Sequence, residues 1–232
     1  MKTQSTFVAS TSLLKAKADN FFGTCLEISF SGIPENKAYA LWKDMTKELS
    51  LLEKVFDAEN PASEVSVLNS SKVDIETSEL MKEALNLCES YLIKTKGLFN
   101  INRLPNDGLD FSGFVKAYSI QRLCALLKKA KVKNYFLNFG GRVICASGNQ
   151  PYCEGWYYTL YDETGEEELE EFLLKNESLA FSLFDDRLSM VRSKDPLEAK
   201  ILSLVLPVAT SSQRHEMSYS FKNLDEKYYH FR

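Results

Sequence analysis

Histidine is scarce in this chain, which has only two histidines among its 232 residues. That scarcity argues against histidine-based metal centres and against catalytic triads with an imidazole base. The cysteines are five, an odd number, and no two of them form a Cys-x-x-Cys pair. We therefore expect the thiols to be small core residues of a protein from a reducing compartment.

Long apolar runs and a strong excess of one charge are missing as well. No stretch approaches the roughly 20 apolar residues of a membrane-spanning helix. The first 20 residues are polar and contain neither an apolar signal core nor a lipid-attachment cysteine behind an apolar leader. The net charge is −4 and the pI about 5.4, which does not favour nucleic acid or an anionic membrane as a partner. We expect a cytoplasmic protein.

Apolar residues make up 44% of the chain and charged residues 26%, as in ordinary globular proteins. Apolar residues at three- and four-residue spacing predict helices, and alternating or short apolar runs predict strands. The predicted helices are 38–55, 78–97, 120–130 and a short acidic helix at 166–174. The predicted strands are 26–30, 135–139, 143–146, 156–161, 179–183, 188–191, 201–206 and 228–231. Because helices and strands mix without strict alternation, we expect an α+β fold with antiparallel-rich sheets.

The first residues, 1–19, are rich in Ser, Thr, Lys and Ala, and we expect them to form a loosely ordered arm. The remaining residues, 20–232, show no internal repeat and no low-complexity linker, so we expect a single domain.

The stretch from Asp110 to Tyr118 precedes a predicted helix and combines an acid, a glycine and a lysine. Asp110 could accept hydrogen bonds from a ligand hydroxyl or ring N–H, and Lys116 could meet a phosphate near a helix N-terminus. The alternative is a helix-capping aspartate and a solvated lysine. Gly113 lies between them with no evident turn that would need it.

Four other segments each allow a ligand-binding and a purely structural interpretation. Phe22-Gly23-Thr24 is either a site residue group or a turn before a strand. Gly97 to Asn102 could bind a ligand, or form a helix C-cap and an Asx turn. Gly140-Gly141 allows either close ligand approach or a two-residue hairpin turn. Thr210-Ser211 could bind a polar ligand or cap a turn.

Read in order, these segments resemble the FAD:protein FMN transferase family, also called the ApbE family. Phe22-Gly23-Thr24 resembles its Met-Gly-Thr, and 63–69 (SEVSVLN) its S-E-[IL]-S-x-[LF]-N. Residues 97–102 (GLFNIN) are similar to G-x-F-D-[IP]-T, and 110–118 (DFSGFVKAY) to D-L-G-G-[IV]-[AG]-K-G-Y. Residues 138–141 resemble N-x-G-G-D and 208–212 resemble V-A-T-S-G. The resemblance spans nearly the whole chain in collinear order.

The resemblance implies an ApbE-like α+β fold and a Mg²⁺-dependent transfer of FMN from FAD to a threonine or serine of an acceptor protein. It names no catalytic side chain here. By the resemblance, the backbone carbonyl oxygen of Gly113 would be a ligand of the metal. The positions that the resemblance assigns to FAD or a related nucleotide are Phe22, Leu98, Phe99, Asn100, Asp110, Lys116, Gly140, Gly141, Thr210 and Ser211.

The chain departs from the family pattern at several polar positions. Asn100 and Arg142 replace aspartates, Asn102 replaces a threonine, and Ala117 replaces a glycine. Residues 227–230 resemble the segment that reaches the family's H-I-I-D-P-x-T-G. The family's later [AS]-D-x-x-[AS]-T segment, with the main Mg²⁺ carboxylate, has no counterpart, so Mg²⁺ binding is in doubt. Substitute carboxylates near Gly113 could only be Asp107, Asp185 or Asp186.

These departures leave two alternatives open. One is an active flavin transferase, and the other is a catalytically degenerate relative that binds flavin or nucleotide, or acts through protein contacts. If a terminal segment is missing, we expect an uncovered sheet edge near the predicted strand before Val208, which a homodimer could cover.

Overall fold

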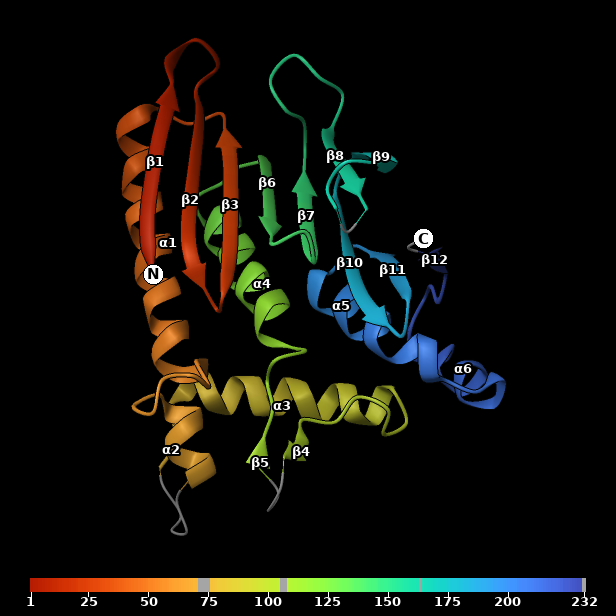
Figure 1. The fold of residues 1–232 in the computed structure, drawn as a ribbon. Helices are drawn as coiled ribbons and strands as arrows, with labels where there is room; N and C mark the ends of the chain where they lie inside the picture. The colour runs from red at the N-terminus through yellow and green to blue at the C-terminus, as the bar shows by residue number, and fades with distance from the viewer. Residues whose placement is uncertain (71–75, 105–107, 163, 231–232) are drawn as a thin grey trace.

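An eight-stranded antiparallel sheet runs through the protein, in the order β1-β2-β3-β6-β7-β10-β11-β12 (Figure 1). The computed structural model describes residues 1–70, 76–104, 108–162 and 164–230. The strands are β1 (Lys2–Val8), β2 (Leu13–Phe21), β3 (Thr24–Ser31), β6 (Asn134–Phe139), β7 (Val143–Ser147), β10 (Glu177–Phe184), β11 (Arg187–Ser193) and β12 (Glu226–His230). With the helices below, this confirms the predicted α+β class.

Helices cover one face of this sheet. They are α1 (Glu35–Phe56), α2 (Glu64–Ser70), α3 (Glu79–Lys94), α4 (Val115–Lys129), α5 (Pro196–Val205) and α6 (Ser211–Met217). Helices α1, α4 and α5 pack on the sheet and on one another, whereas α3 crosses one end of the molecule (Figure 1). The predicted Ser78 start of α3 is confirmed, because the Ser78 hydroxyl accepts a hydrogen bond from the Met81 N–H at 3.1 Å.

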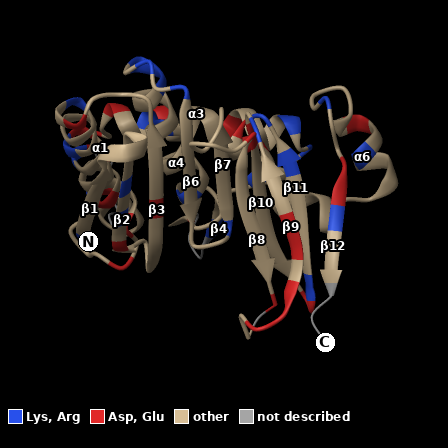
Figure 2. Cartoon of the chain, turned by 90° about the horizontal axis from the view of Figure 1, so that it is seen from above, with Lys and Arg blue, Asp and Glu red and all other residues tan. Residues whose placement is uncertain are grey.

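A hairpin covers part of the other face, and Figure 2 shows it in front of β10 and β11. It consists of β8 (Trp156–Tyr161) and β9 (Glu168–Leu174). Trp156 and Phe172 of the hairpin join Phe181 of β10 in a second hydrophobic core, separate from the main core between sheet and helices. A small two-stranded sheet, β4 (Asn102–Leu104) with β5 (Gly108–Leu109), precedes α4.

The expectation of a loosely ordered arm at 1–19 is wrong, because β1 and most of β2 form there. Leu14, Ala16 and Ala18 alternate with exposed or half-buried lysines and an aspartate along β2, and Leu14 and Ala18 are completely buried. Their small alanines carry little hydrophobic signal, although the alternation itself is that of a half-buried strand.

Two further elements differ from prediction. Residues 166–174 contribute strand β9 rather than a helix, with Phe172 and Leu174 buried against the second core and acidic side chains mostly outside. Residues 201–206 are mostly helix α5 rather than a strand. Asp195 caps this helix, its carboxylate accepting from the N–H groups of Leu197 and Glu198, and Pro196 occupies the first turn.

The predicted sheet edge near Val208 is therefore not there, since residues 206–208 are a 3₁₀ turn after α5. The edges of the large sheet are β1 and β12. The end of the predicted strand at 228–231, residue 231, lies outside the described residues. The cysteines are free thiols, and Cys88, Cys124 and Cys145 are buried in the core as predicted. None of the described helices combines the length and apolar composition that crossing a membrane requires.

Candidate functional site

A cavity of about 440 Å³ opens between the β2–β3 turn, the C-terminal end of α1 and the N-terminal end of α4. It unites three residues that the sequence predicts for a ligand site: Phe22, Asp110 and Lys116. Its volume lies within the range of small-molecule sites, roughly 300–1,000 Å³. Phe56 and Phe111 contribute apolar walls.

The β2–β3 turn presents Phe22 at the cavity. Phe22 and Gly23 both have positive φ, +46° and +73°, which gives the tight two-residue turn that joins twisted antiparallel strands. Phe21 beside it is fully buried, and its ring stacks on Phe139 of β6 at 5.4 Å between centroids. The turn is thus both a hairpin connection and one wall of the cavity, so the two interpretations of this segment are compatible.

Asp110 enters the cavity on a turn that leads directly into α4. Its Oδ1 accepts a hydrogen bond from the Ser112 N–H at 2.9 Å, an Asx turn that shapes the loop. Phe111 and Phe114 are buried in the main core and hold this loop against it. Lys116 lies in the first turn of α4, with its Nζ 5.7 Å from the centroid of the Phe139 ring.

Asn69 of α2 holds the loop before Asp110 in place. Its Nδ2 donates to the Leu109 carbonyl at 2.9 Å, and its Oδ1 accepts from the Leu109 N–H at 2.8 Å. One side chain thereby satisfies both backbone groups of Leu109, as a neighbouring strand would. Glu64, at the start of α2, similarly accepts from the Ser78 N–H that precedes α3. The 63–69 segment thus links three elements around the cavity.

Replacing Asn69 with alanine is expected to lower the free energy of unfolding by about 1 kcal/mol, because two hydrogen bonds at an exposed position are lost. Asn69→Asp keeps the acceptor but turns a carboxylate oxygen toward the Leu109 carbonyl, so its loss should be at least as large. Urea unfolding of the three proteins measures both effects. Equal stability of Asn69→Ala and the wild type would show that the Leu109 tether contributes nothing.

The lining of the cavity includes both acidic side chains and a cation. Glu53, Asp57, Glu59 and Asp110 line it, and burial raises the pKa of the Glu53 carboxyl. Lys116 is its sole cation among the described residues. The carboxylate acceptors suit the N–H and hydroxyl groups of a nucleoside, and the cation suits a phosphate.

Two more cations lie close to Lys116, and neither was predicted as a site residue. Burial lowers the pKa of both Lys116 and Lys200, and the positive charge of Arg142 lowers both pKa values further. Lys200, on α5, is 9% exposed, and its Nζ donates to the Phe181 carbonyl at 2.8 Å and to the Ser182 hydroxyl at 2.7 Å. The available signal was a lysine among apolar residues just before the predicted strand at 201–206, and it was not used.

Other predicted ligand positions lie elsewhere. Leu98 and Phe99 pack against the main core, and Asn100 forms an Asx turn by accepting from the Asn102 N–H. Thr210 is the N-cap of α6, where it forms a capping box with Gln213, and Ser211 is the first helical residue. These residues are not among those that line the cavity. Their structural interpretations account for the geometry described here, and their nucleotide-binding role stays a prediction.

Gly140 and Gly141 form the β6–β7 hairpin turn, both with positive φ (+57° and +64°). The sequence left open a hairpin turn or close approach to a ligand, and the geometry is that of the hairpin turn. A side chain at Gly140 would also lie 2.5 Å from the Thr24 Oγ1, so the two hairpin tips touch each other. The turn places Arg142 at the start of the return strand beside Lys116.

The described residues do not fit the Mg²⁺ ion that the resemblance implies. They contain no group of three His, Cys, Asp or Glu side chains that could hold a metal ion, and the carboxylates that line the cavity do not form one either. Asp185 and Asp186 form the β10–β11 turn, and Asp107 lies outside the described residues. Gly113 instead backs onto α5, where an added Cβ would lie 2.9 Å from the Leu204 Cδ1.

Helix α5 has the spacing of the family's [AS]-D-x-x-[AS]-T segment. Ala199 and Ser203 stand at its two small positions. Lys200 stands where the pattern has the metal-binding aspartate, and Leu204 where it has threonine. In the family order this segment comes after V-A-T-S-G, whereas α5 comes before residues 208–212, so the likeness is one of spacing alone.

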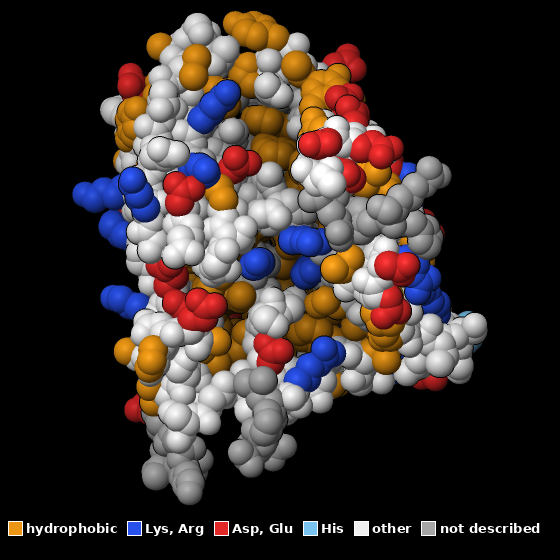
Figure 3. Space-filling model, viewed as in Figure 1, with side chains coloured by type: hydrophobic (Ala, Val, Ile, Leu, Met, Phe, Trp, Pro, Cys, Tyr) orange, Lys and Arg blue, Asp and Glu red, His pale blue; other side chains and the backbone are white. Residues whose placement is uncertain are grey.

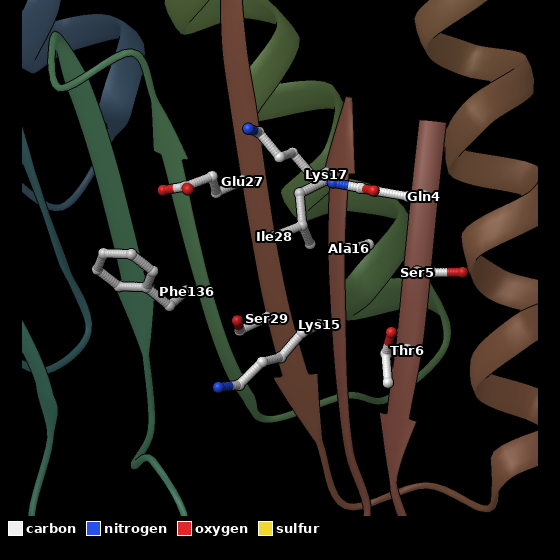
Figure 4. A pocket seen from close by; sticks show the side chains of 10 residues that line it. All are labelled: Gln4, Ser5, Thr6, Lys15, Ala16, Lys17, Glu27, Ile28, Ser29 and Phe136. Carbon is white, nitrogen blue, oxygen red and sulfur yellow. The ribbon is translucent and has the colours of Figure 1, made fainter. Parts of the chain in front are cut away.

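A second hollow lies on the open sheet face of β1, β2 and β3 (Figure 4). Its side chains form cross-strand rows, such as Gln4, Lys17 and Glu27. Asn138 continues this row and donates to Glu27 at 3.2 Å, while Lys17 pairs with Asp19 at 3.0 Å. The charges are paired locally, as on a solvated sheet face, and the hollow contains none of the predicted site residues.

Comparison with known proteins supports the resemblance. The ApbE family matches residues 102–182, a segment that contains Asp110, Lys116 and Arg142. A comparison with curated proteins gave no match.

Solved structures with the same fold include two that are flavin transferases by name. The flavin transferase ApbE from Vibrio cholerae aligns with a TM-score of 0.77 at 12% identity, over 95% of this chain and 97% of that one. The apo flavinyl transferase ApbE from Pseudomonas stutzeri gives 0.70 at 12%, over 100% and 94%. The ApbE protein from Thermotoga maritima gives 0.71 at 15%, over 92% and 93%. The chain has the ApbE fold, and the predicted resemblance to this family is confirmed.

Proposed function

We propose that the protein binds FAD, or a closely related flavin nucleotide, in the cavity bounded by Phe22, Asp110 and Lys116. The observation that carries the proposal is the convergence of these three residues, which lie far apart in the sequence, on one cavity of suitable volume. Phe22 offers a ring for stacking, Asp110 an acceptor for a nucleoside hydroxyl or N–H, and Lys116 a positive charge for phosphate. The ApbE fold supports the choice of a flavin nucleotide.

Transfer of FMN to a protein hydroxyl is the reaction that the resemblance implies. It would require the acceptor oxygen to attack the FMN phosphorus while the bond to the AMP phosphate breaks. In this chain the described residues do not supply a Mg²⁺ site, so we favour a flavin-binding protein over a Mg²⁺-dependent transferase. Incubation with FAD and a threonine-bearing acceptor, followed by mass spectrometry for the FMN adduct, separates the two.

Removing the Phe22 ring is expected to weaken FAD binding about tenfold, because stacking and apolar burial contribute about 1.4 kcal/mol at such a site. Calorimetric titration of wild type and Phe22→Ala measures the change. Tyr152→Ala is a matched control, since Tyr152 is also an aromatic residue with positive φ, is 91% exposed, and lies outside the cavity. Wild-type affinity for Phe22→Ala, or no FAD binding by any of the proteins, would contradict the proposal.

Two partner predictions accompany this function. We expect an acceptor protein as a partner only if the protein transfers FMN. A homodimer could form along the exposed sheet edges, β1 or β12, and light scattering of the purified protein tests it. The cytoplasmic location also stays a prediction.

A further inference from the structure

Three cations without a carboxylate partner lie near one another, and we call Lys116, Arg142 and Lys200 the cation cluster. Of these, Lys116 lines the cavity. They come from three separate elements: the first turn of α4, the β6–β7 turn and the middle of α5. None of them forms a salt bridge within the described residues. Figure 3 shows Lys and Arg side chains gathered around the hollow in the middle of this face.

Hydrogen bonds tie two of these residues to the same strand, Arg142 through its backbone and Lys200 through its side chain. The Arg142 carbonyl accepts from the Phe181 N–H at 2.8 Å, and the Phe181 carbonyl accepts from the Lys200 Nζ at 2.8 Å. Phe181 thus connects both residues in the middle of β10. The Ser182 hydroxyl, the second acceptor of Lys200, is itself bonded to Ser203 at 2.7 Å.

The buried ammonium lacks a neutralising neighbour. An ammonium has three donors, and Lys200 uses two of them, both on neutral acceptors, within the described part of the chain. The charged groups that act on it are Arg142 and Lys116, both of the same sign. Buried charges in folded proteins are normally paired, so this arrangement is incomplete without an anion.

A purely structural role for Lys200 is the alternative, with a neutral amine joining α5 to β10. That role would explain the two hydrogen bonds but not the neighbouring cations. The guanidinium of Arg142 remains charged at any ordinary pH, and a structural amine gains nothing from its proximity. Three convergent positive groups are instead the usual recognition pattern for phosphate oxygens.

We propose that the cation cluster binds the diphosphate of a nucleotide without a metal ion, and that the Lys200 ammonium supplies the positive charge for which a transferase of this fold would need Mg²⁺. The proposal rests on the proposed function for the identity of the ligand. The cluster itself can be tested with inorganic pyrophosphate alone.

The test is calorimetric titration of the intact protein with pyrophosphate at pH 6.5 in EDTA, where no divalent metal is free. Wild type should bind. Lys200→Met should bind at least tenfold more weakly, and so should Arg142→Gln, which leaves the α5 core untouched. The control Lys129→Met removes an exposed lysine of α4 and should bind as wild type.

The pH dependence distinguishes a ligand contact from a structural role. Burial and the two neighbouring cations lower the pKa of Lys200 to about 7, so pyrophosphate affinity should fall as the pH rises through 7. Tyr158, whose pKa burial raises to about 12, faces Arg142 and stays neutral over this interval. Pyrophosphate itself titrates over this range, but equally for both proteins. The ratio of the wild-type to the Lys200→Met association constant should therefore decrease from pH 6 to pH 9.

The failures of the two proposals are separable. Binding of pyrophosphate that depends on Lys200, with no binding of FAD, would uphold the cluster and overturn the proposed function. FAD binding that is unchanged in Lys200→Met would uphold the function and overturn the cluster. Pyrophosphate binding that appears only with added Mg²⁺ would also overturn the cluster.

Discussion

Replacing Lys200 with methionine is expected to stabilise the ligand-free protein at pH 6 by about 2–4 kcal/mol. The lysine titrates near pH 7 in the folded state, against 10.5 for an ordinary lysine, and this difference corresponds to roughly 5 kcal/mol of charge-burial cost. Methionine removes that cost and fills a similar volume. It leaves the Phe181 carbonyl without its donor, which costs about 1–3 kcal/mol and accounts for the smaller net gain.

The gain should disappear as the pH rises. Between pH 7 and 10.5 the unfolded chain keeps the Lys200 proton while the folded protein has released it, so the unfolded state binds more protons. Wild-type stability therefore increases with pH across this window. Lys200→Met lacks this slope and keeps the cost of the lost donor, so the two stability curves should cross between about pH 8 and 10.

Urea unfolding at pH 6, 8 and 9.5 measures the effect, with Lys129→Met as the control for loss of an exposed lysine. A Lys200→Met protein less stable than wild type at pH 6 would contradict the charge-burial account. Pyrophosphate at saturating concentration should reduce the stability advantage of Lys200→Met over the wild type at pH 6. Only the wild type has a buried charge that the anion neutralises.

Sequence patterns predicted those elements whose apolar residues follow one period over a long stretch. Helix α1 shows three- and four-residue spacing over six turns, and its predicted core residues are buried. The strands β6 and β7 alternate or form short apolar runs, and the Gly140-Gly141 turn between them was one of two stated alternatives. Local chemistry was sufficient in these places.

The mistaken elements are those in which the partner decides the structure. Glutamates and leucines in 168–174 favour a helix by propensity, but pairing with β8 and burial of Phe172 make a strand. In 196–206 the apolar run has no clear period, because α5 is buried on most sides between β10, β11 and α4. The Asp195-Pro196 start signal was present there and was outweighed by the run of apolar residues.

The candidate site was predictable only where its residues stood in a motif. Asp110 and Lys116 fall in one segment, and Phe22 was included through the resemblance. Arg142 was noted only as a departure from an aspartate, and Lys200, just before the predicted strand at 201–206, was not noted. Their proximity depends on the packing of α5 against β10, which no local pattern expresses.

Truncating Phe114 to alanine is expected to lower the free energy of unfolding by about 3–5 kcal/mol, as large core deletions do. Phe114 is completely buried, and its ring stacks on Tyr118 at 5.0 Å and meets Phe111 at 5.9 Å. Phe111 in turn contacts Phe56 at 5.0 Å, and both line the cavity. The variant should therefore loosen the Asp110 loop as well as the core.

The affinity for FAD shows whether this aromatic cluster supports the site. Phe114→Ala, studied at a temperature where it remains folded, should bind FAD more than tenfold more weakly. Phe172→Ala removes an equally buried ring from the second core and should lose similar stability without a change in affinity. An equal loss of affinity in both variants would mean that general destabilisation weakens binding, whereas a loss confined to Phe114→Ala would mean that this cluster positions Asp110 for the ligand.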